Sequence, residues 1–115
     1  MATLKHLDTQ SFDLAIKNAE TPVLVDFYAD WCGPCKALAP VLESVAETSP
    51  DSLSVVKVDI DDNPELAVRF GIQKIPTLVL FSGGEVQDQI TGLLSKGDLL
   101  ARLDPFIAAA RPAVH

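Results

Sequence analysis

The two cysteines of this 115-residue chain, Cys32 and Cys35, are the residues whose type and spacing point to chemistry. They lie in residues 31–36 (WCGPCK), between an apolar stretch and the start of an expected helix. Side chains three positions apart on a helix share one face, so the two sulfur atoms can come within disulfide reach. The loop that such a bond closes is too short to stabilise the fold much by constraining the unfolded chain. We therefore predict a dithiol that reacts by opening and closing its disulfide.

The position of each cysteine predicts its part in that reaction. Cys32 lies just past the apolar stretch and is expected at the solvent-accessible mouth of the helix, where free N–H groups and the helix dipole favour a thiolate. Cys35 lies one turn further in and is expected to be better buried. The Cys32 thiolate would attack a target disulfide, and Cys35 would then attack the mixed disulfide and release the reduced product. Gly33 would let the target backbone approach closely, and Pro34 would stiffen the turn.

Two other interpretations of the cysteines are half of a zinc site and an inert pair in the core. Zinc sites need about four ligands. The two histidines of the chain, His6 and His115, stand near its two ends. We therefore expect no bound metal.

Two charged residues stand inside apolar stretches. Asp26 lies within residues 23–28 (VLVDFY), and burial there would raise the pKa of its carboxyl group. A buried acid near Cys35 could accept the proton of the resolving thiol. Lys57 is embedded in residues 53–59 and could meet Asp26 if the two strands are neighbours in suitable register. The alternatives are an Asp26 that faces solvent from an edge strand and a Lys57 that reaches water along its aliphatic stem.

The composition bounds the class of protein. With 48% hydrophobic residues, the chain can bury a core without disulfide staples or a structural metal. The net charge of −7 argues against a surface that binds nucleic acid. Two cysteines are too few for a secreted disulfide framework, and their spacing is that of a redox pair in a reducing compartment. No apolar run is long enough for a membrane span, and residues 1–13 hold no signal-peptide core. We therefore expect a cytoplasmic monomer that binds neither nucleic acid nor membrane.

Hydrophobic periodicity predicts strands and helices in regular alternation. The expected strands cover residues 4–7, 23–28, 53–59, 77–81 and 85–91, and the expected helices cover 11–19, the cysteine motif to about 48, 64–70 and 95–109. The early alternation needs parallel crossovers, whereas the tight turn at Gly83-Gly84 needs an antiparallel pair. The fold class is therefore α/β with a mixed central β-sheet.

The chain contains no repeat or linker, so residues 1–115 are expected to form a single domain. Its ordered core would cover about 4–109, followed by a tail at 111–115. Pro40 and Pro105 fall inside expected helices, where a proline removes a backbone hydrogen bond and bends or divides the helix. The acidic residues between positions 59 and 63 are interpreted as a loop that caps the following helix.

Residues 25–36 (VDFYADWCGPCK) resemble the active-site signature of the thioredoxin family. Further segments match in register, at 57–59 (KVD), 63–64 (NP), 75–77 (IPT) and Gly92. The resemblance extends from about residue 4 to residue 106. It implies the thioredoxin fold, in which a central sheet of five strands carries helices on both faces. It also implies a thiol–disulfide oxidoreductase that acts as a general protein-disulfide reductase.

The resemblance implies roles for individual residues as well. Cys32 would be the attacking thiol and Cys35 the resolving thiol of a redox disulfide. Asp26 and Lys57 would be a buried pair that handles the proton. The Ile75–Pro76 peptide bond would be cis and lie beside Cys32.

The implied partners are protein disulfides and a thioredoxin reductase that draws electrons from NADPH, with no cofactor bound to this chain. Substrates would dock on an apolar surface made by Trp31, Gly33, Pro34, Ile75, Pro76 and Gly92. The chain departs from the common pattern at Tyr28, where many members carry Trp, and at Lys74, where a small residue is frequent. Lys74 is expected to alter the charge complementarity to partners.

Two rival functions stay open. The domain could dock to a larger protein as a binding module, with the dithiol only tuning affinity. It could instead be an oxidant or isomerase in an oxidising compartment. A double Cys→Ser variant that keeps full function would favour the binding module, and a strongly oxidising potential would favour the oxidant.

Overall fold

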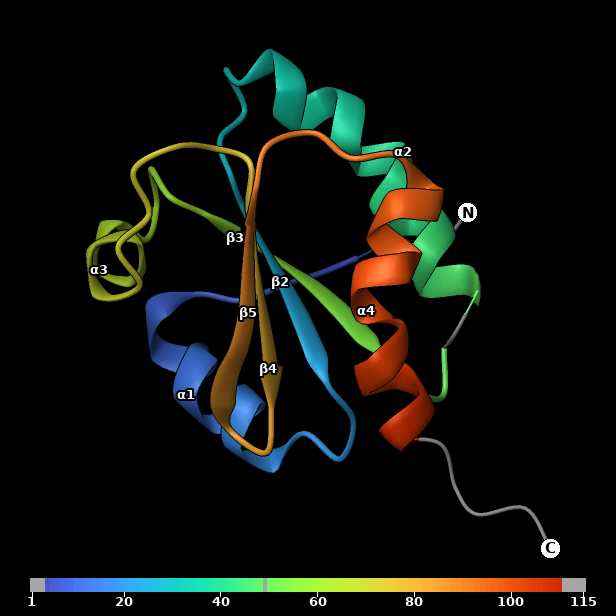
Figure 1. Cartoon of the computed structure of the whole chain (residues 1–115). Helices are drawn as coiled ribbons and strands as arrows, with labels where there is room; N and C mark the ends of the chain where they lie inside the picture. Colours follow the sequence, from blue (N-terminus) through green and yellow to red (C-terminus); the bar gives the residue numbers. More distant parts are fainter. Residues whose placement is uncertain (1–3, 49, 111–115) are drawn as a thin grey trace, which may run out of the picture.

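The computed structural model describes residues 4–48 and 50–110, and its elements follow the predicted order (Figure 1). The strands are β1 (Lys5–His6), β2 (Val23–Tyr28), β3 (Ser54–Asp59), β4 (Thr77–Ser82) and β5 (Glu85–Thr91). The helices are α1 (Thr9–Asn18), α2 (Gly33–Thr48), α3 (Pro64–Arg69) and α4 (Lys96–Ala110). The predicted tail at 111–115 lies outside the described residues.

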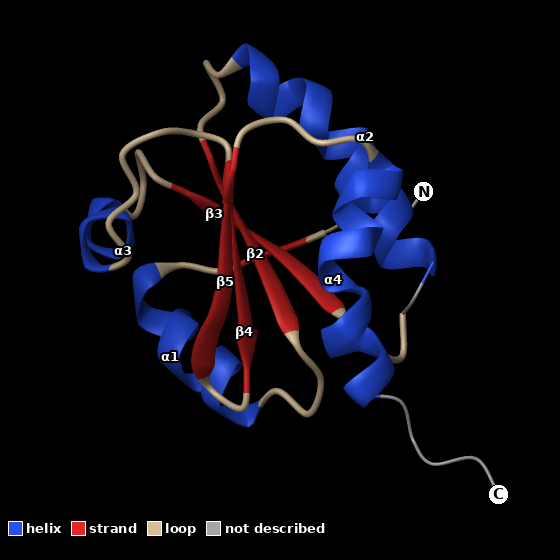
Figure 2. Cartoon of the chain, in the orientation of Figure 1, coloured by secondary structure: helices blue, strands red, loops and turns tan. Residues whose placement is uncertain are grey.

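The strands form one mixed sheet in the order β1-β3-β2-β4-β5 (Figure 2). β3 pairs in parallel with both β1 and β2, as crossover connections require. β4 pairs antiparallel with β2 and with β5. The predicted mixed α/β class is confirmed, and β2, which leads directly into the cysteine motif, lies at the centre of the sheet.

Helices cover both faces of the sheet. In Figure 1, α1 and α3 lie on one side of it and α2 and α4 on the other. Phe12 and Ile16 of α1 pack with Val25 and Phe27 of β2. On the opposite face the packed set includes Leu24, Leu38, Leu42, Leu78, Leu99 and Leu103. Every residue of β2 is buried because neighbouring strands and helices enclose it on all sides.

Local signals fix the ends of several elements. Asp8 caps α1, since its side chain accepts from the Ser11 N–H while Ser11 reaches back to the Asp8 N–H. Gly83 and Gly84 both have positive φ, at 61° and 82°, and form the two-residue turn between β4 and β5. The turn sets the pairing of Ser82 with Glu85 and of Phe81 with Val86, and the register shifts by one residue between Phe81 and Leu80.

The two prolines inside helices do not divide them. Pro40 lies within α2 and Pro105 within α4, and each helix continues past its proline. In the described part of the chain, no helix has the length and apolar character needed to cross a membrane.

Candidate active site

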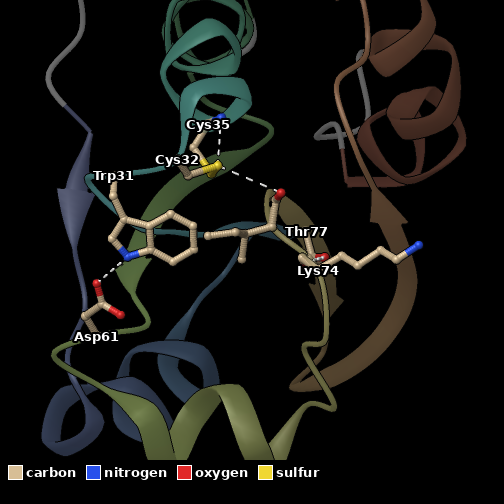
Figure 3. The surroundings of a disulfide bond; sticks show 7 residues. Trp31, Cys32, Cys35, Asp61, Lys74 and Thr77 are labelled. Atoms are coloured by element: carbon tan, nitrogen blue, oxygen red, sulfur yellow. Dashed lines mark hydrogen bonds between the residues drawn. A yellow bond between two sulfur atoms is a disulfide. The ribbon is translucent and has the colours of Figure 1, made fainter.

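Cys32 and Cys35 form a disulfide bond at the start of α2, with their Cα atoms 5.2 Å apart (Figure 3). Since α2 begins at Gly33, Cys32 occupies the N-cap position of this helix. The backbone N–H of Cys35 donates to Cys32 Sγ over 3.2 Å. A capping side chain normally accepts this bond through oxygen, and here sulfur takes its place. The structure therefore brings together the two residues that the sequence singled out.

The start of α2 favours negative charge. Its first N–H groups have no partners inside the helix, and the helix dipole places partial positive charge at this end. The first turn of α2 contains no acidic residue, and Lys36 follows Cys35 directly. Once the disulfide is reduced, this environment favours a thiolate at Cys32 over a thiol.

The two cysteines are equally buried, which corrects one prediction. We expected an accessible Cys32 and a better-buried Cys35, but each residue is 4% exposed. Both pack in a small cluster with Tyr28 and Ala29. The disulfide holds Cys32 Sγ toward the helix, and the Ile75 carbonyl oxygen lies 3.8 Å from it. In this closed state little of Cys32 faces water.

The loop before β4 lies against the disulfide through Ile75. The Ile75–Pro76 peptide bond is cis, as the family resemblance implied. The Pro76 carbonyl accepts a hydrogen bond of 2.9 Å from the Gly92 N–H. Gly92 has a φ of 99°, a conformation that side-chain-bearing residues rarely adopt. Ile75 therefore lies beside Cys32, and Gly92 lies beside Pro76.

The six residues of the predicted docking surface differ in exposure, and their role in docking stays a prediction. Five of its six residues are at least partly exposed, namely Trp31, Gly33, Pro34, Ile75 and Gly92. Pro76 is buried, because it leads into the enclosed strand β4 and its carbonyl is paired with Gly92. Leu93, which follows Gly92, is 54% exposed and extends the apolar surface. Leu93 could not be predicted from the sequence, because a single leucine after a strand carries no signal of exposure.

Asp26 is buried at the centre of the sheet, with only 1% of its surface exposed. The edge-strand alternative is wrong, since β2 pairs with β3 on one side and β4 on the other. The Oδ1 atom of Asp26 has no hydrogen-bond partner among the described residues. Burial raises the pKa of Asp26 to about 7, although the charge of Lys57 acts in the opposite direction. A carboxyl group that changes charge near neutral pH is suited to proton transfer.

The packing of its neighbours places Asp26 beneath the start of α2. Leu24, Asp26 and Tyr28 share one face of β2, because side chains alternate along a strand. Leu24 packs with residues of α2, and Tyr28 packs with the two cysteines. Asp26 lies between these two neighbours on the strand. No hydrogen bond joins it to Cys35 in the part of the chain that the structure describes.

Lys57 stands opposite Asp26 on β3, in the register that the sequence analysis required for the pair to meet. Its side chain is partly buried. The ammonium nitrogen lies 4.2 Å from the centroid of the Tyr28 ring. The charged end of Lys57 therefore lies over an aromatic ring. The alternative, a lysine whose ammonium group reaches into open water, did not include this contact.

Asp61 belongs to the site, although the sequence analysis treated it only as part of an acidic loop. The indole N–H of Trp31 donates to Asp61 Oδ2 over 2.8 Å (Figure 3). Thirty residues separate the pair in the chain, so no local pattern could have linked them. Lys74 extends from the opposite side of the site, away from the disulfide (Figure 3).

A resident metal has no ligand set in the described residues. Within 4–48 and 50–110, no group of three or more His, Cys, Asp or Glu side chains is placed to hold a metal ion.

Comparison with known proteins identifies the family to which this site belongs. The family model described as Thioredoxin matches residues 3–105 of the chain. A thioredoxin of Alicyclobacillus acidocaldarius is 48% identical over 97 residues, which cover 84% of this chain and 91% of that protein. A thioredoxin of Porphyra purpurea is 44% identical over 98 residues, covering 85% and 92% of the two chains.

Chloroplast proteins also occur among the relatives. Thioredoxin Y2, chloroplastic, of Arabidopsis thaliana is 44% identical over 94 residues, covering 82% of this chain and 56% of that protein. The five-stranded mixed sheet, the helices on both faces and the Cys32–Cys35 disulfide agree with the family assignment. The chain therefore belongs to the thioredoxin family of thiol–disulfide oxidoreductases.

Proposed function

We propose that the chain is a general protein-disulfide reductase that exchanges its Cys32–Cys35 dithiol with the disulfides of target proteins. The observation that carries this proposal is the cysteine pair at the start of α2, where Cys32 Sγ accepts the Cys35 N–H. The Cα atoms are 5.2 Å apart, a separation at which the bond can open and close without large backbone movement.

The reaction begins with the reduced protein. The Cys32 thiolate attacks one sulfur of the target disulfide, the target S–S bond breaks, and one target thiolate leaves. A mixed disulfide now joins Cys32 to the target. The Cys35 thiol then loses its proton, and its thiolate attacks Cys32 Sγ and expels the second target thiolate. Two electrons have passed to the target, and the chain is left with the Cys32–Cys35 disulfide.

Asp26 is the proposed acceptor of the Cys35 proton. Its support is its position beneath the start of α2 together with its pKa of about 7, which lets it exchange a proton near neutral pH. Because no hydrogen bond joins it to Cys35, we assign the transfer to an intervening water molecule. Lys57, opposite Asp26 on β3, stabilises the charged carboxylate.

The target would dock on the apolar residues around the disulfide. Trp31 is 69% exposed, and Ile75 and Gly92 are partly exposed. Exposed apolar groups that surround a reactive pair suit extended segments of many sequences, because apolar contact is not directional. This favours a broad set of protein substrates.

A thioredoxin reductase that takes electrons from NADPH is the proposed source of reducing power, and we propose that no cofactor is bound to this chain. The two electrons would return through the same dithiol exchange in reverse order. The proposed compartment is the cytoplasm, where a reducing environment keeps such a pair cycling.

Reduction of insulin disulfides, driven by NADPH and a thioredoxin reductase, tests exchange and recycling together. We expect NADPH consumption that depends on the chain and is abolished in Cys32→Ser. If the chain reduces insulin with dithiothreitol but not with the reductase, the recycling partner is wrong. If it fails with both donors while the Cys32–Cys35 disulfide is shown to be reduced, the proposed function is wrong.

Equilibration with glutathione separates reduction from oxidation. A potential near those of reducing members of the family supports the proposal. A strongly oxidising potential would instead assign the chain to disulfide formation.

A further inference from the structure

Three ionisable side chains form a row across the sheet at the active-site end. Lys57 of β3 is the register partner of His6 on β1 and of Asp26 on β2. Register partners on neighbouring parallel strands point to the same face of a sheet. The row therefore runs from an exposed imidazole, through a partly buried ammonium group, to a carboxyl group that is 1% exposed.

Tyr28 lies beside this row and contacts two of its members. Its ring centroid is 4.2 Å from Lys57 Nζ. Its hydroxyl lies 3.2 Å from His6 Nδ1, and the two rings meet edge to face with centroids 5.9 Å apart. The ring is buried, and it also packs in the cluster that holds Cys32 and Cys35. Tyr28 is thus fixed at its hydroxyl end by His6 and along its ring by the cysteine cluster.

The position of the Lys57 ammonium matters because Asp26 has little else to stabilise its charge. The Oδ1 atom of Asp26 has no hydrogen-bond partner in the described residues. Lys57 is the positive charge that acts on it. A lysine side chain has four rotatable bonds and would otherwise swing into water, where it is better solvated and further from the carboxyl group. The face of an aromatic ring attracts a cation and restricts this motion.

We propose that Tyr28 is a positioning residue, whose ring, anchored by His6, holds the Lys57 ammonium beside the buried Asp26. The inference rests on the proposed proton transfer from Cys35 to Asp26 for its functional meaning. The positioning itself can be measured separately from catalysis.

The direction of the effect follows from the charges around Asp26. Burial raises the pKa of Asp26, and the nearby Lys57 charge lowers it. The other groups that face this region are Tyr28 itself, the disulfide on α2, and His6 beyond the Tyr28 hydroxyl. The pKa of Tyr28 is raised to about 12, mainly by burial. The carboxylates whose charge reaches Tyr28, besides Asp26, are Asp59, Asp30 and Asp62. Because Tyr28 is uncharged near neutral pH, replacing it removes no charge and acts on Asp26 through the freedom of Lys57.

The test is the titration of the Asp26 carboxyl carbon by NMR in the oxidised protein. In Tyr28→Leu we expect the Asp26 midpoint to rise by about 0.5–1 pH unit, since the ammonium group is no longer held nearby. In Tyr28→Phe the ring remains and only the His6 contact is lost, so the rise should be smaller. Lys57→Met should give the largest rise, because the positive charge itself is removed.

A double-mutant cycle shows whether Tyr28 acts through Lys57. In the Lys57→Met background, Tyr28→Leu and Tyr28→Phe should produce no further shift of the Asp26 midpoint. An equal shift in both backgrounds, or none in either, would overturn the proposal. If Tyr28→Leu does not fold, the same comparison with the nearly isosteric Tyr28→Phe decides the question.

The proton-transfer role is tested apart from this cycle, by the pH dependence of mixed-disulfide release. If the NMR midpoints move as expected while the release rate keeps its pH profile, the positioning is correct and the role of Asp26 in the reaction is wrong. If the midpoints do not move, the positioning is wrong whatever the kinetics show.

Discussion

The indole N–H of Trp31 donates a hydrogen bond of 2.8 Å to Oδ2 of Asp61, which joins the residue before the reactive disulfide to the loop after β3. Trp31 is otherwise 69% exposed, so this bond is what fixes the orientation of a large apolar side chain at the surface. A fixed ring presents the same face to each partner and loses less rotational freedom on binding.

We expect Asp61→Ala to raise the KM for protein disulfides by about 3–10-fold, with little change in kcat, because it frees the ring without touching the dithiol. Asp61→Asn should restore most of the loss, since its amide oxygen can accept the same bond. Trp31 is the single tryptophan of the chain, so its fluorescence reports both ring mobility and binding. Asp62→Ala is the matched control on the neighbouring exposed carboxylate. An equal effect of Asp61→Ala and Asp62→Ala would mean that loop charge matters and the bond does not.

The two cysteines should fail in different ways when each is replaced. Cys35→Ser leaves the attacking thiolate in place but removes the group that breaks the mixed disulfide, so a covalent complex with the target should accumulate. Cys32→Ser should give no complex and no turnover, because it removes the sulfur at the N-cap of α2, where a thiolate is favoured, and the remaining Cys35 lies inside the helix. Mass spectrometry of the chain mixed with an oxidised target, before and after dithiothreitol, checks both outcomes. Repeated turnover by Cys35→Ser would mean that Cys35 is not the resolving thiol.

Much of the fold could be predicted because its signals are local. The apolar run of β2, the capping residue Asp8 and the Gly83-Gly84 turn each fix a piece of backbone through short-range chemistry. The spacing of Cys32 and Cys35 at a helix start likewise implies a pair that can meet. The cis bond before Pro76 was available only from the family resemblance, since most proline peptide bonds are trans.

Other features of the site could not be predicted because they depend on tertiary contacts. The Trp31–Asp61 bond and the Lys57–Tyr28 contact join residues that only the sheet and its loops bring together. The burial of Cys32 was misjudged for the same reason, since the loop that holds Ile75 packs against it from a distant part of the chain. Strand alternation could suggest that Asp26 and Lys57 meet, but the register that places them opposite each other had to be observed.

Asp26 should make the stability of the fold depend on pH. In the unfolded chain its pKa is the ordinary 3.8, and in the folded protein burial raises it to about 7. Between these values the folded state keeps a proton that the unfolded state has lost, so stability falls as the pH rises from about 4 to about 7. Above pH 7 the shift in pKa corresponds to a loss of at most about 4 kcal/mol in the free energy of unfolding.

We therefore expect Asp26→Asn to be more stable than the parent protein at pH 8 and to lose this advantage near pH 4. The gain should stay below the full amount, because the amide brings N–H donors into a buried site. Urea unfolding across this pH range measures the difference. Asp13→Asn is the control, because Arg69 lowers the pKa of Asp13 instead of raising it. Removing the Asp13 carboxylate should therefore give no gain in stability at pH 8. A pH-independent gain in Asp26→Asn would mean that the pKa of Asp26 is not raised on folding, so that the buried carboxyl group is charged as it is in the unfolded chain.

The same substitution should change the kinetics of the resolving step. With Asp26 acting as the base, release of a mixed disulfide should accelerate as the pH rises through about 7 and then level off. Asp26→Asn should abolish this inflection and slow release by at least about tenfold near neutral pH. Stopped-flow fluorescence of Trp31 on a preformed mixed disulfide follows the step directly. An unchanged profile would assign the Cys35 proton to solvent.

Lys74 should bias the choice of substrate by charge. It is exposed directly before Ile75, on the side of the disulfide opposite Trp31, and forms no ion pair within the described residues. Lys74→Glu should lower kcat/KM for a disulfide peptide flanked by acidic residues by about 3–10-fold at low salt, raise it for a basic peptide, and lose both effects at high salt. Lys17→Glu makes the same charge change on α1, which packs on the face of the sheet opposite α2. This variant should leave the ratio of kcat/KM for the acidic and basic peptides unchanged. The bias belongs to Lys74 only if the two variants differ, because net charge alone would move both alike.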